Sequence, residues 1–277
     1  KANWEPKSLN LSNTAAELNL LPESFVFVDD NPAEREIVSQ QLNGVSVPEI
    51  DTVEHYIQII DKSGFFEVTA LSEDDLKRNE MYQENAKRQK LQSTFVNYED
   101  YLKSLEMKGE IKSFSPLYMS RIAQLTNKSN QFNLTTRRYN QSDIESLSKD
   151  PKHITLYGKL GDKFGDNGVV SVVIGRIDGN DNDELHMELW LMSCRVLKRD
   201  MEFAMMDELV EKAKNAGVKK IFGYYYPTAK NAMVKGFYGT QGFTKVSEDS
   251  EGNSVWEFDI KDNYQKKQNV IKVNQDN

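Results

Sequence analysis

The sequence predicts a chain of α/β and α+β class, in which a charged helix joins two regions. Residues 8–42 alternate helical apolar spacing with one continuous apolar run, as in an α/β unit. Residues 72–95 are rich in charge and contain neither Pro nor Gly, as in an exposed helix. From residue 101 onward, apolar runs of strand length alternate with helical patterns, which is typical of an α+β domain.

The first region, residues 1–63, begins with apolar residues at near-helical spacing over residues 8–20, which predict a helix. Residues 25–30, FVFVDD, form an apolar run that ends in two acids and predict a buried strand. Residues 31–42 return to a helical pattern, with Pro32 in the first turn, where its missing N–H costs little. These units are too few for a whole α/β domain, so we expect the later part of one.

Residues 64–97 are expected to form a helical linker that is capped near Ser72. Residues 98–260 follow as the α+β domain, and the polar residues 261–277 are expected to be a frayed tail. The expected helices are residues 118–126, 202–216 and 229–238, and the expected strands are residues 153–159, 169–177, 185–192, 220–226, 243–246 and 255–260.

The acidic stretch DGNDNDE at residues 178–184 fits a hairpin turn better than a calcium loop. Asp183 and Leu189 stand where such a loop needs Gly and Glu.

Composition argues against several classes of protein. The chain has 35 Lys and Arg against 43 Asp and Glu, a net charge of -8 that disfavours a nucleic-acid or membrane-surface binder. No apolar run approaches the roughly 20 residues that span a bilayer. The single cysteine, Cys194, cannot form an internal disulfide, and with no recognisable signal peptide a cytoplasmic location is expected.

The three histidines, His55, His153 and His186, lack the spacing of metal ligands, so no transition-metal site is expected. For His186 two roles stay open, a structural one and that of a base.

Two adjacent acids, Asp29 and Asp30, end the first apolar run, where α/β folds place ligands. Carboxylate oxygens suit Mg²⁺, and Lys7 supplies a charge for a phosphate. The pattern alone leaves a turn or helix-capping role equally open.

The segments NWEPKSLNL (residues 3–11) and FVFVDDNPAERE (residues 25–36) resemble the third and fourth motifs of the haloacid dehalogenase (HAD) superfamily. The match is to its FkbH-like branch, in which a subfamily IIIC phosphatase is fused to a GNAT-like acyltransferase domain and serves glyceryl–acyl-carrier-protein formation. The resemblance implies that Lys7 holds the phosphate and that Asp29 and Asp30 hold Mg²⁺. The family's first motif, an Asp-x-Asp pair that supplies the nucleophile, has no counterpart before Lys7, so the HAD-like lobe is expected to be partial and without phosphatase activity.

The second region resembles the acyltransferase half of the same family in LTNKSNQFNLTTRRY (residues 125–139), FGDNG (164–168) and LMSCRVL (191–197). The segment NAMVKGFYGTQGFTKV (231–246) resembles GNAT acetyltransferases, which implies that Asn231 and Tyr238 approach a cofactor or leaving thiol.

The loop after residue 193 precedes a predicted helix, and its backbone N–H groups are placed to receive a pyrophosphate. The expected cofactor-binding residues are Arg195, Val196, Leu197 and Arg199. The family has Gly-Arg-Gly where this chain has Lys198, Arg199 and Asp200, so coenzyme A (CoA) is expected to bind weakly. The phosphopantetheine arm of a carrier protein lacks the nucleotide end and is less affected.

Arg137 and Arg138 are expected to bind a phosphoglycerate-type molecule through paired hydrogen bonds, with Asn133 and Gln131 as polar neighbours. Cys194 follows an apolar strand and precedes a helix among basic residues, which predicts a lowered thiol pKa and a glyceryl-acceptor role. The alternative for Cys194 is a small core residue.

The resemblance implies part of a bifunctional glyceryl transferase and phosphatase. Such an enzyme loads a glyceryl group from 1,3-bisphosphoglycerate onto an acyl carrier protein, as in polyketide biosynthesis of the methoxymalonyl type. Two alternatives stay open: a non-catalytic module that docks a carrier protein, and a GNAT acyl-CoA N-acyltransferase.

Overall fold

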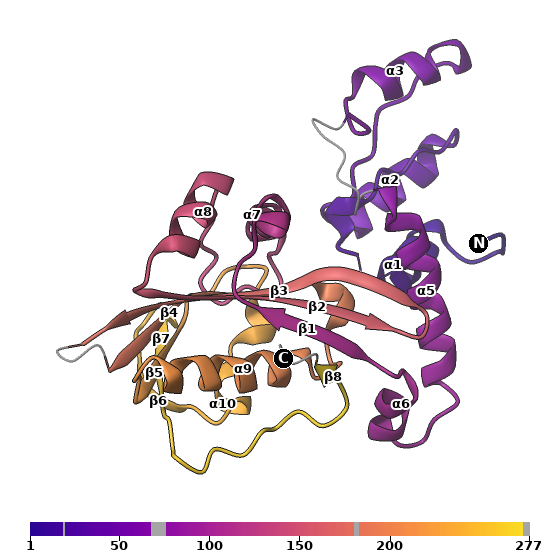
Figure 1. Cartoon of the computed structure of the whole chain (residues 1–277). Coiled ribbons are helices and arrows are strands. Elements are labelled where there is room, and N and C mark those ends of the chain that lie inside the picture. Colours follow the sequence, from indigo (N-terminus) through magenta and orange to yellow (C-terminus); the bar gives the residue numbers. More distant parts are fainter. Residues whose placement is uncertain (19, 68–75, 180–182, 274–277) are drawn as a thin grey trace. The chain divides into compact units, whose positions relative to one another are not determined.

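The computed structural model describes residues 1–18, 20–67, 76–179 and 183–273. The chain divides into two compact units, residues 1–90 (unit 1) and residues 91–277 (unit 2) (Figure 1). The boundary falls inside helix α5 (Arg78–Gln92), within the predicted linker. The predicted cap at Ser72 lies outside the described residues. None of the described helices is both long and apolar enough to cross a membrane.

Unit 1 contains the helices α1 (Lys7–Leu18), α2 (Pro32–Gln41) and α3 (Tyr56–Lys62). The first two confirm the predicted helices. Asn31 caps α2, because its side chain accepts a hydrogen bond from the N–H of Ala33. The short helix α3 has no strong apolar period and was missed.

The predicted strand at residues 25–30 is wrong. The described residues of unit 1 form only one bridge there, between Val26 and Ser46. The N–H of Phe27 donates to the Ser46 carbonyl over 2.8 Å, and no wider ladder follows among the described residues. Val28 is 38% exposed, so this apolar run lies half-buried at the surface of the unit rather than inside a sheet.

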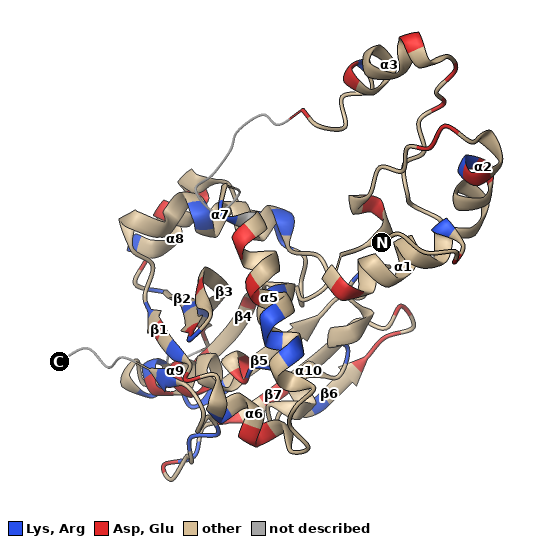
Figure 2. Cartoon of the chain, turned by 90° about the vertical axis from the view of Figure 1, so that its right-hand side faces the viewer, with Lys and Arg blue, Asp and Glu red and all other residues tan. Residues whose placement is uncertain are grey.

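Charges along α5 are segregated, as Figure 2 shows. Glu80 and Glu84 lie in its first half, whereas Lys87 and Lys90 lie in its last turns. This order favours the helix, because acids stabilise its N-terminal end and bases its C-terminal end.

Unit 2 is a mixed α/β structure built on one sheet of eight strands in the order β6-β7-β5-β4-β3-β2-β1-β8. The strands are β1 (Lys108–Lys112), β2 (His153–Asp162), β3 (Gly165–Asp178), β4 (Glu184–Met192), β5 (Lys220–Tyr225), β6 (Thr244–Glu248), β7 (Ser254–Asp259) and β8 (Lys272–Val273). Neighbouring strands are antiparallel, except that β4 pairs with β5 and β1 pairs with β8 in parallel. All six predicted strands are confirmed, and β1 and β8 were missed.

The predicted hairpin between β3 and β4 agrees with the pairing of Asp178 with Glu184. Residues 180–182 of its turn lie outside the described residues.

Helices cover both faces of the sheet in unit 2. Helices α7 (Met119–Lys128) and α8 (Gln141–Lys149) lie on one face, and α9 (Met201–Asn215) and α10 (Phe237–Thr240) lie on the other (Figure 1). Alternation along the strands supplies a core to each face, so that Ile174 packs on the α7 side and Val173 on the α9 side. A further short helix, α6 (Tyr98–Ser104), opens the unit.

The predicted helix at residues 229–238 is wrong over most of its length. A 3-10 turn at Ala232–Val234 and the short α10 take its place. The side chain of Asn231 bonds to backbone groups here, which competes with a helical start.

The predicted frayed tail is also wrong up to residue 273. Val270 and Ile271 belong to the core, with exposures of 9% and 5%. The buried Asp207 carboxylate accepts hydrogen bonds from the Tyr264 hydroxyl and from the N–H of Lys267. Residues 274–277 lie outside the described residues.

Candidate functional site

In the described chain, β4 and β5 pair directly only over residues 184–186 and 220–222. Beyond these residues the two strands separate, and a third segment of the chain forms hydrogen bonds to both. Leu134 donates its N–H to the Trp190 carbonyl, and Met192 donates to the Phe132 carbonyl. Tyr226, which follows β5, donates to the Leu134 carbonyl over 2.9 Å. The chain therefore fills the gap between β4 and β5 with its own residues 132–134.

A β-bulge sits in β4 next to this segment. The register against β3 shifts between Ile174 and Gly175, which leaves Glu188 as an extra residue. The Thr135 hydroxyl donates to the Glu188 carbonyl over 2.7 Å and so satisfies a backbone group at the bulge. A bulge of this kind re-aims its side chain relative to the regular alternation.

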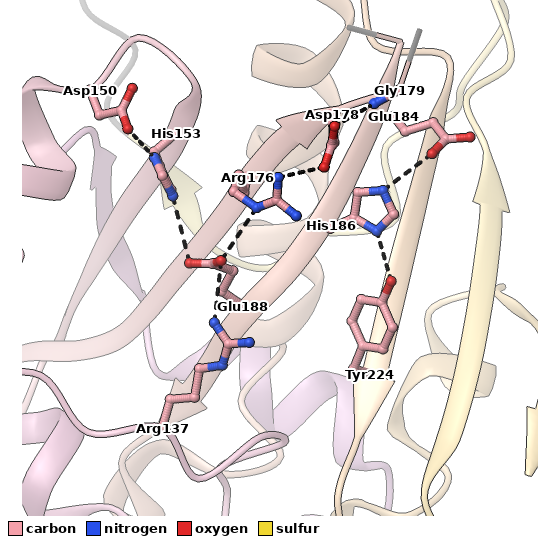
Figure 3. Close-up of polar contacts among 10 residues, drawn as sticks. All are labelled: Arg137, Asp150, His153, Arg176, Asp178, Gly179, Glu184, His186, Glu188 and Tyr224. Carbon is pink, nitrogen blue, oxygen red and sulfur yellow. Dashed lines mark hydrogen bonds and ion pairs between the residues drawn. The ribbon is translucent and has the colours of Figure 1, made fainter.

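Three charged or ionisable groups gather around the Glu188 carboxylate (Figure 3). Arg137 Nη1 lies 3.2 Å and Arg176 Nε 3.6 Å from the same oxygen, Oε1. His153 Nε2 lies 3.6 Å from Oε2, and Asp150 holds the other ring nitrogen of His153 at 2.9 Å. The Glu188 side chain is only 17% exposed, whereas Arg137 and Arg176 are nearly half exposed. Glu188 therefore anchors two guanidinium groups that reach the surface.

A second polar chain lies beside the first (Figure 3). His186 Nδ1 is 2.7 Å from the Tyr224 hydroxyl, and His186 Nε2 is 3.2 Å from a Glu184 oxygen. The imidazole stacks on the Phe222 ring, with centroids 5.0 Å apart and an interplanar angle of 9°. Burial raises the pKa of Tyr224 above its ordinary value.

Members of both polar groups line one cavity of about 170 Å³, named the Glu188 cavity below. Its lining residues are Thr135, Arg137, Arg176, His186, Met187, Glu188, Tyr224 and Tyr226. The volume equals that of about six waters at roughly 30 Å³ each, which suits a small molecule. Burial lowers the pKa of Arg137, but Tyr139 and Glu188 raise it further, so the guanidinium stays charged.

The predicted pair Arg137 and Arg138 is separated by the structure. Arg137 lines the Glu188 cavity, whereas Arg138 binds the Ser129 carbonyl at 3.0 Å and also the Thr126 carbonyl and the Asn130 side chain. Arg138 thus closes the loop after α7.

Two predicted neighbours of the arginine pair lie in the filled gap or just before it. Asn133 is fully buried, and its side chain bonds to the backbone of Ser129 and Thr136. Gln131 precedes the buried residues and is not among the residues that line the Glu188 cavity.

Asn231, predicted to approach a cofactor, is fully buried, and both polar atoms of its side chain form hydrogen bonds. Its Oδ1 accepts from the Thr228 N–H, and its Nδ2 donates to the carbonyls of Asn133 and Tyr226, each over 2.9 Å. It ties the filled gap to the chain that follows β5.

Tyr238, the other predicted residue of that segment, is 1% exposed, and burial raises its pKa strongly. Its ring packs on Gly223, where an added Cβ would lie 2.4 Å from a ring carbon.

The loop before α9 keeps an unusual conformation without glycine. Lys198 and Asp200, which replace the two expected glycines, have φ values of 62° and 60°. Arg199, between them, is buried and pairs with Asp162. Of the other predicted cofactor residues, Val196 is fully buried, and Arg195 and Leu197 are half-buried.

Acidic groups dominate the start of α9. Burial and the nearby Glu99 raise the pKa of Asp200, and burial together with Asp200 raises the pKa of Glu202. The Arg199 guanidinium pairs with Asp162, so its charge is directed to that carboxylate and not to the start of α9. The carboxyl groups of Asp200 and Glu202 at the helix start disfavour a CoA pyrophosphate there.

The lowered pKa predicted for Cys194 is wrong. Burial raises the pKa of this thiol, and the charge of Arg195 lowers it by less. Cys194 lies in the 3-10 turn Cys194–Val196 after β4 and is not among the residues that line the Glu188 cavity.

In unit 1 the structure brings Lys7 and Asp29 into an ion pair. Burial raises the pKa of Asp29, but the hydrogen bonds from Lys7 and the Asn31 N–H hold it below its ordinary value. Both oxygens of Asp29 are thus engaged, and Asp30 is exposed. The described residues contain no group of three or more His, Cys, Asp or Glu that could hold a metal ion.

Sequence reasoning missed Arg176, Glu188 and Tyr224. A signal exists for the first two, because each is a charged residue inside an otherwise apolar strand, in VVIGRID and LHMELWLM. Charges in such positions are rarely left without a partner. Nothing local marks Tyr224 among the aromatic residues of β5.

Comparison with known proteins gives structural matches only. No protein-family model matches the chain. No curated protein matches it either. The ribosomal-protein-S18-alanine N-acetyltransferase from Escherichia coli is 12% identical, covers 57% of this chain and 99% of its own, and has a TM-score of 0.41. The GNAT domain of S. lividans PAT is 16% identical, covers 54% of this chain and 89% of its own, and has a TM-score of 0.43. The putative acetyltransferase yncA from Salmonella typhimurium, solved with acetyl-CoA, is 10% identical, covers 58% of this chain and 98% of its own, and has a TM-score of 0.41.

Proposed function

We propose that unit 2 is a GNAT-like acyltransferase domain that holds a small anionic acyl substrate in the Glu188 cavity. The observation that carries the proposal is the pair of half-exposed guanidinium groups, Arg137 and Arg176, that meet at Glu188. Each guanidinium has five N–H donors in a planar fork, more than its ion pairs use. This fork matches the oxygens of a carboxylate or phosphate.

The substrate class in this proposal comes from the sequence resemblance. The donor is a phosphoglycerate-type acyl phosphate, 1,3-bisphosphoglycerate, and the acceptor is the phosphopantetheine thiol of an acyl carrier protein. An acyl phosphate is already activated, so its transfer to a thiol does not require CoA. The acidic start of α9, which suits CoA poorly, agrees with such a donor.

The first test measures binding of 3-phosphoglycerate to the whole chain by calorimetry. Arg176→Gln is expected to weaken binding about 10- to 100-fold, because a hydrogen bond to a charged group contributes about 1.5–3 kcal/mol. Lys212→Gln removes a cation from the surface of α9 and serves as the control. Equal affinities for the two variants would contradict the proposed site.

The second test measures transfer. The whole chain is incubated with 1,3-bisphosphoglycerate and pantetheine, and the thioester product is identified by mass spectrometry. If acetyl-CoA and an amine give product while the acyl phosphate does not, the protein is an acyl-CoA N-acyltransferase instead.

A second candidate function is a non-catalytic module that docks a carrier protein. The filled gap between β4 and β5 favours it, because Phe132 and Leu134 are buried there at 6% and 0% exposure. In that case a carrier protein binds the chain, and no thioester forms from either donor.

A further inference from the structure

A chain of three side chains, Glu184, His186 and Tyr224, ends in the Glu188 cavity (Figure 3). The Glu184 carboxylate has no proton to donate, so in neutral His186 the proton sits on Nε2, 3.2 Å from that carboxylate. The Nδ1 atom then carries a lone pair and accepts the Tyr224 O–H across 2.7 Å. The network thus fixes one tautomer and points the tyrosine proton at the imidazole.

The chain is held rigidly. The imidazole stacks almost flat on Phe222, and both Phe222 and Tyr224 belong to β5, next to β4, which carries His186. Residues 222 and 224 are two apart and share a face of the strand. Rigid neighbouring strands therefore place the Tyr224 oxygen in the same cavity as Arg137 and Arg176.

We propose that Tyr224 is the catalytic acid–base residue of the Glu188 cavity, with His186 and Glu184 as its positioning residues. The inference rests on the proposed acyl transfer. The thiol sulfur forms a bond to the acyl carbon, and the bond from that carbon to the phosphate oxygen breaks, with its electron pair leaving on phosphate. The thiol proton passes to the Tyr224 oxygen as the Tyr224 proton passes to His186 Nδ1.

The proton then returns by the same route to the departing phosphate, so donor and thiol give thioester and protonated phosphate with no further reactant. Glu184 stabilises the imidazolium that forms in between, in the manner of the acid in a nucleophile–histidine–acid triad. Arg137 and Arg176 take up the charge that develops on the phosphate oxygens.

The charges around His186 favour the imidazolium form that the proposed proton transfer creates. The charged and titratable groups that face it are Glu184 and Glu188 on β4, Arg176 and Asp178 on β3, Tyr224 on β5, Tyr226 just after β5, and Arg137 from the loop after α7. Asp178 and Glu188 pair with Arg176, which leaves Glu184 as the carboxylate in direct contact with the ring.

The experiment measures thioester formation by the whole chain from 1,3-bisphosphoglycerate and pantetheine. Tyr224→Phe is expected to lower kcat about 100-fold and to leave KM and the affinity for 3-phosphoglycerate within twofold. Tyr157→Phe loses a comparable hydroxyl contact, 2.6 Å from Glu110, outside the cavity and is expected to keep the full rate. His186→Gln is expected to lower kcat and to leave KM within twofold, because it removes the group that positions the Tyr224 hydroxyl.

The outcomes separate the two proposals. If the unaltered chain forms thioester and Tyr224→Phe is as fast, Tyr224 is not the acid–base residue, while the proposed function stands. If the unaltered chain forms no thioester although it is folded, the proposed function fails, and the catalytic role of Tyr224 fails with it. A kcat of His186→Gln equal to that of the unaltered chain overturns the assignment of His186.

Discussion

Arg199 and Asp162 form an ion pair inside unit 2, with 3.3 Å between Nη1 and Oδ2 and side-chain exposures of 9% and 0%. The other oxygen of Asp162 accepts the N–H groups of Phe164 and Gly165 in the β2–β3 turn. The pair therefore links the loop before α9 to this hairpin.

Removal of the cation from this pair is expected to be costly. Arg199→Met should lower the free energy of unfolding by about 3–5 kcal/mol, because it removes the cation that lies beside the buried Asp162 carboxylate. Urea denaturation measures the loss. The double variant Asp162→Asn with Arg199→Met should regain most of it, since a neutral amide needs no counter-charge. A double variant as unstable as the single one would show that the charge is not the cause.

Lys198→Gly is expected to raise the free energy of unfolding by about 1 kcal/mol. A non-glycine residue at a φ of 62° is strained by roughly 1–2 kcal/mol, and glycine is not. The matched control is Lys212→Gly inside α9, which should lower stability by about 1 kcal/mol. Thermal or urea unfolding distinguishes the two, and a loss of stability in both variants would contradict the prediction.

Asn231→Ala is expected to destabilise unit 2 by about 2–4 kcal/mol. The change leaves the buried carbonyl of Asn133 without its side-chain partner, which costs about 1–3 kcal/mol, and also frees the part-buried carbonyl of Tyr226 and N–H of Thr228, which water can reach at a lower cost. Loss of hydrogen-exchange protection at Leu134 and Tyr226 should accompany it. Unchanged stability with a selective loss of turnover would indicate a catalytic role instead.

Cys194 is expected to react slowly with iodoacetamide at neutral pH. Burial raises the pKa of the thiol, so at neutral pH less of it is in the reactive thiolate form than in an ordinary cysteine. The rate should therefore rise only when the pH exceeds the ordinary thiol pKa of about 8.5. The chain has one cysteine, so intact mass follows the reaction directly. The urea-unfolded chain is the reference, and a pH midpoint lower in the folded than in the unfolded protein would contradict the prediction.

The sequence predicted the middle of unit 2 well. The strands β2, β3 and β4 are long apolar runs that pair with their neighbours along the chain, so local pattern and pairing agree. The strand β1 reads KGEIK, without a strong apolar run, and its partner β8 lies at the other end of the unit. The prediction of a strand at residues 25–30 was wrong for the opposite reason. The apolar pattern there is strong, but among the described residues the segment forms only one bridge.

The candidate site was predicted only in part. Arg137 lines the Glu188 cavity, as a substrate role requires, whereas the side chain of Asn231 is bonded to backbone groups and Tyr238 is buried in the core. The cavity exists because a bulge turns Glu188 and because residues 132–134 enter the gap beside β4. Both features depend on pairing between distant segments, which no local pattern encodes.

The pairing of β8 with β1 has a consequence for folding during synthesis on the ribosome. Both β1 and its other neighbour β2 are synthesised long before Lys272 and Val273 emerge, so one edge of β1 stays unpaired while the rest of the sheet assembles. Unpaired edges recruit strands from other chains. The pairing of β8 with Lys108 and Gly109 therefore follows the pairing of β1 with β2, and until then this part of the β1 edge is open to contact with neighbouring chains on a polysome.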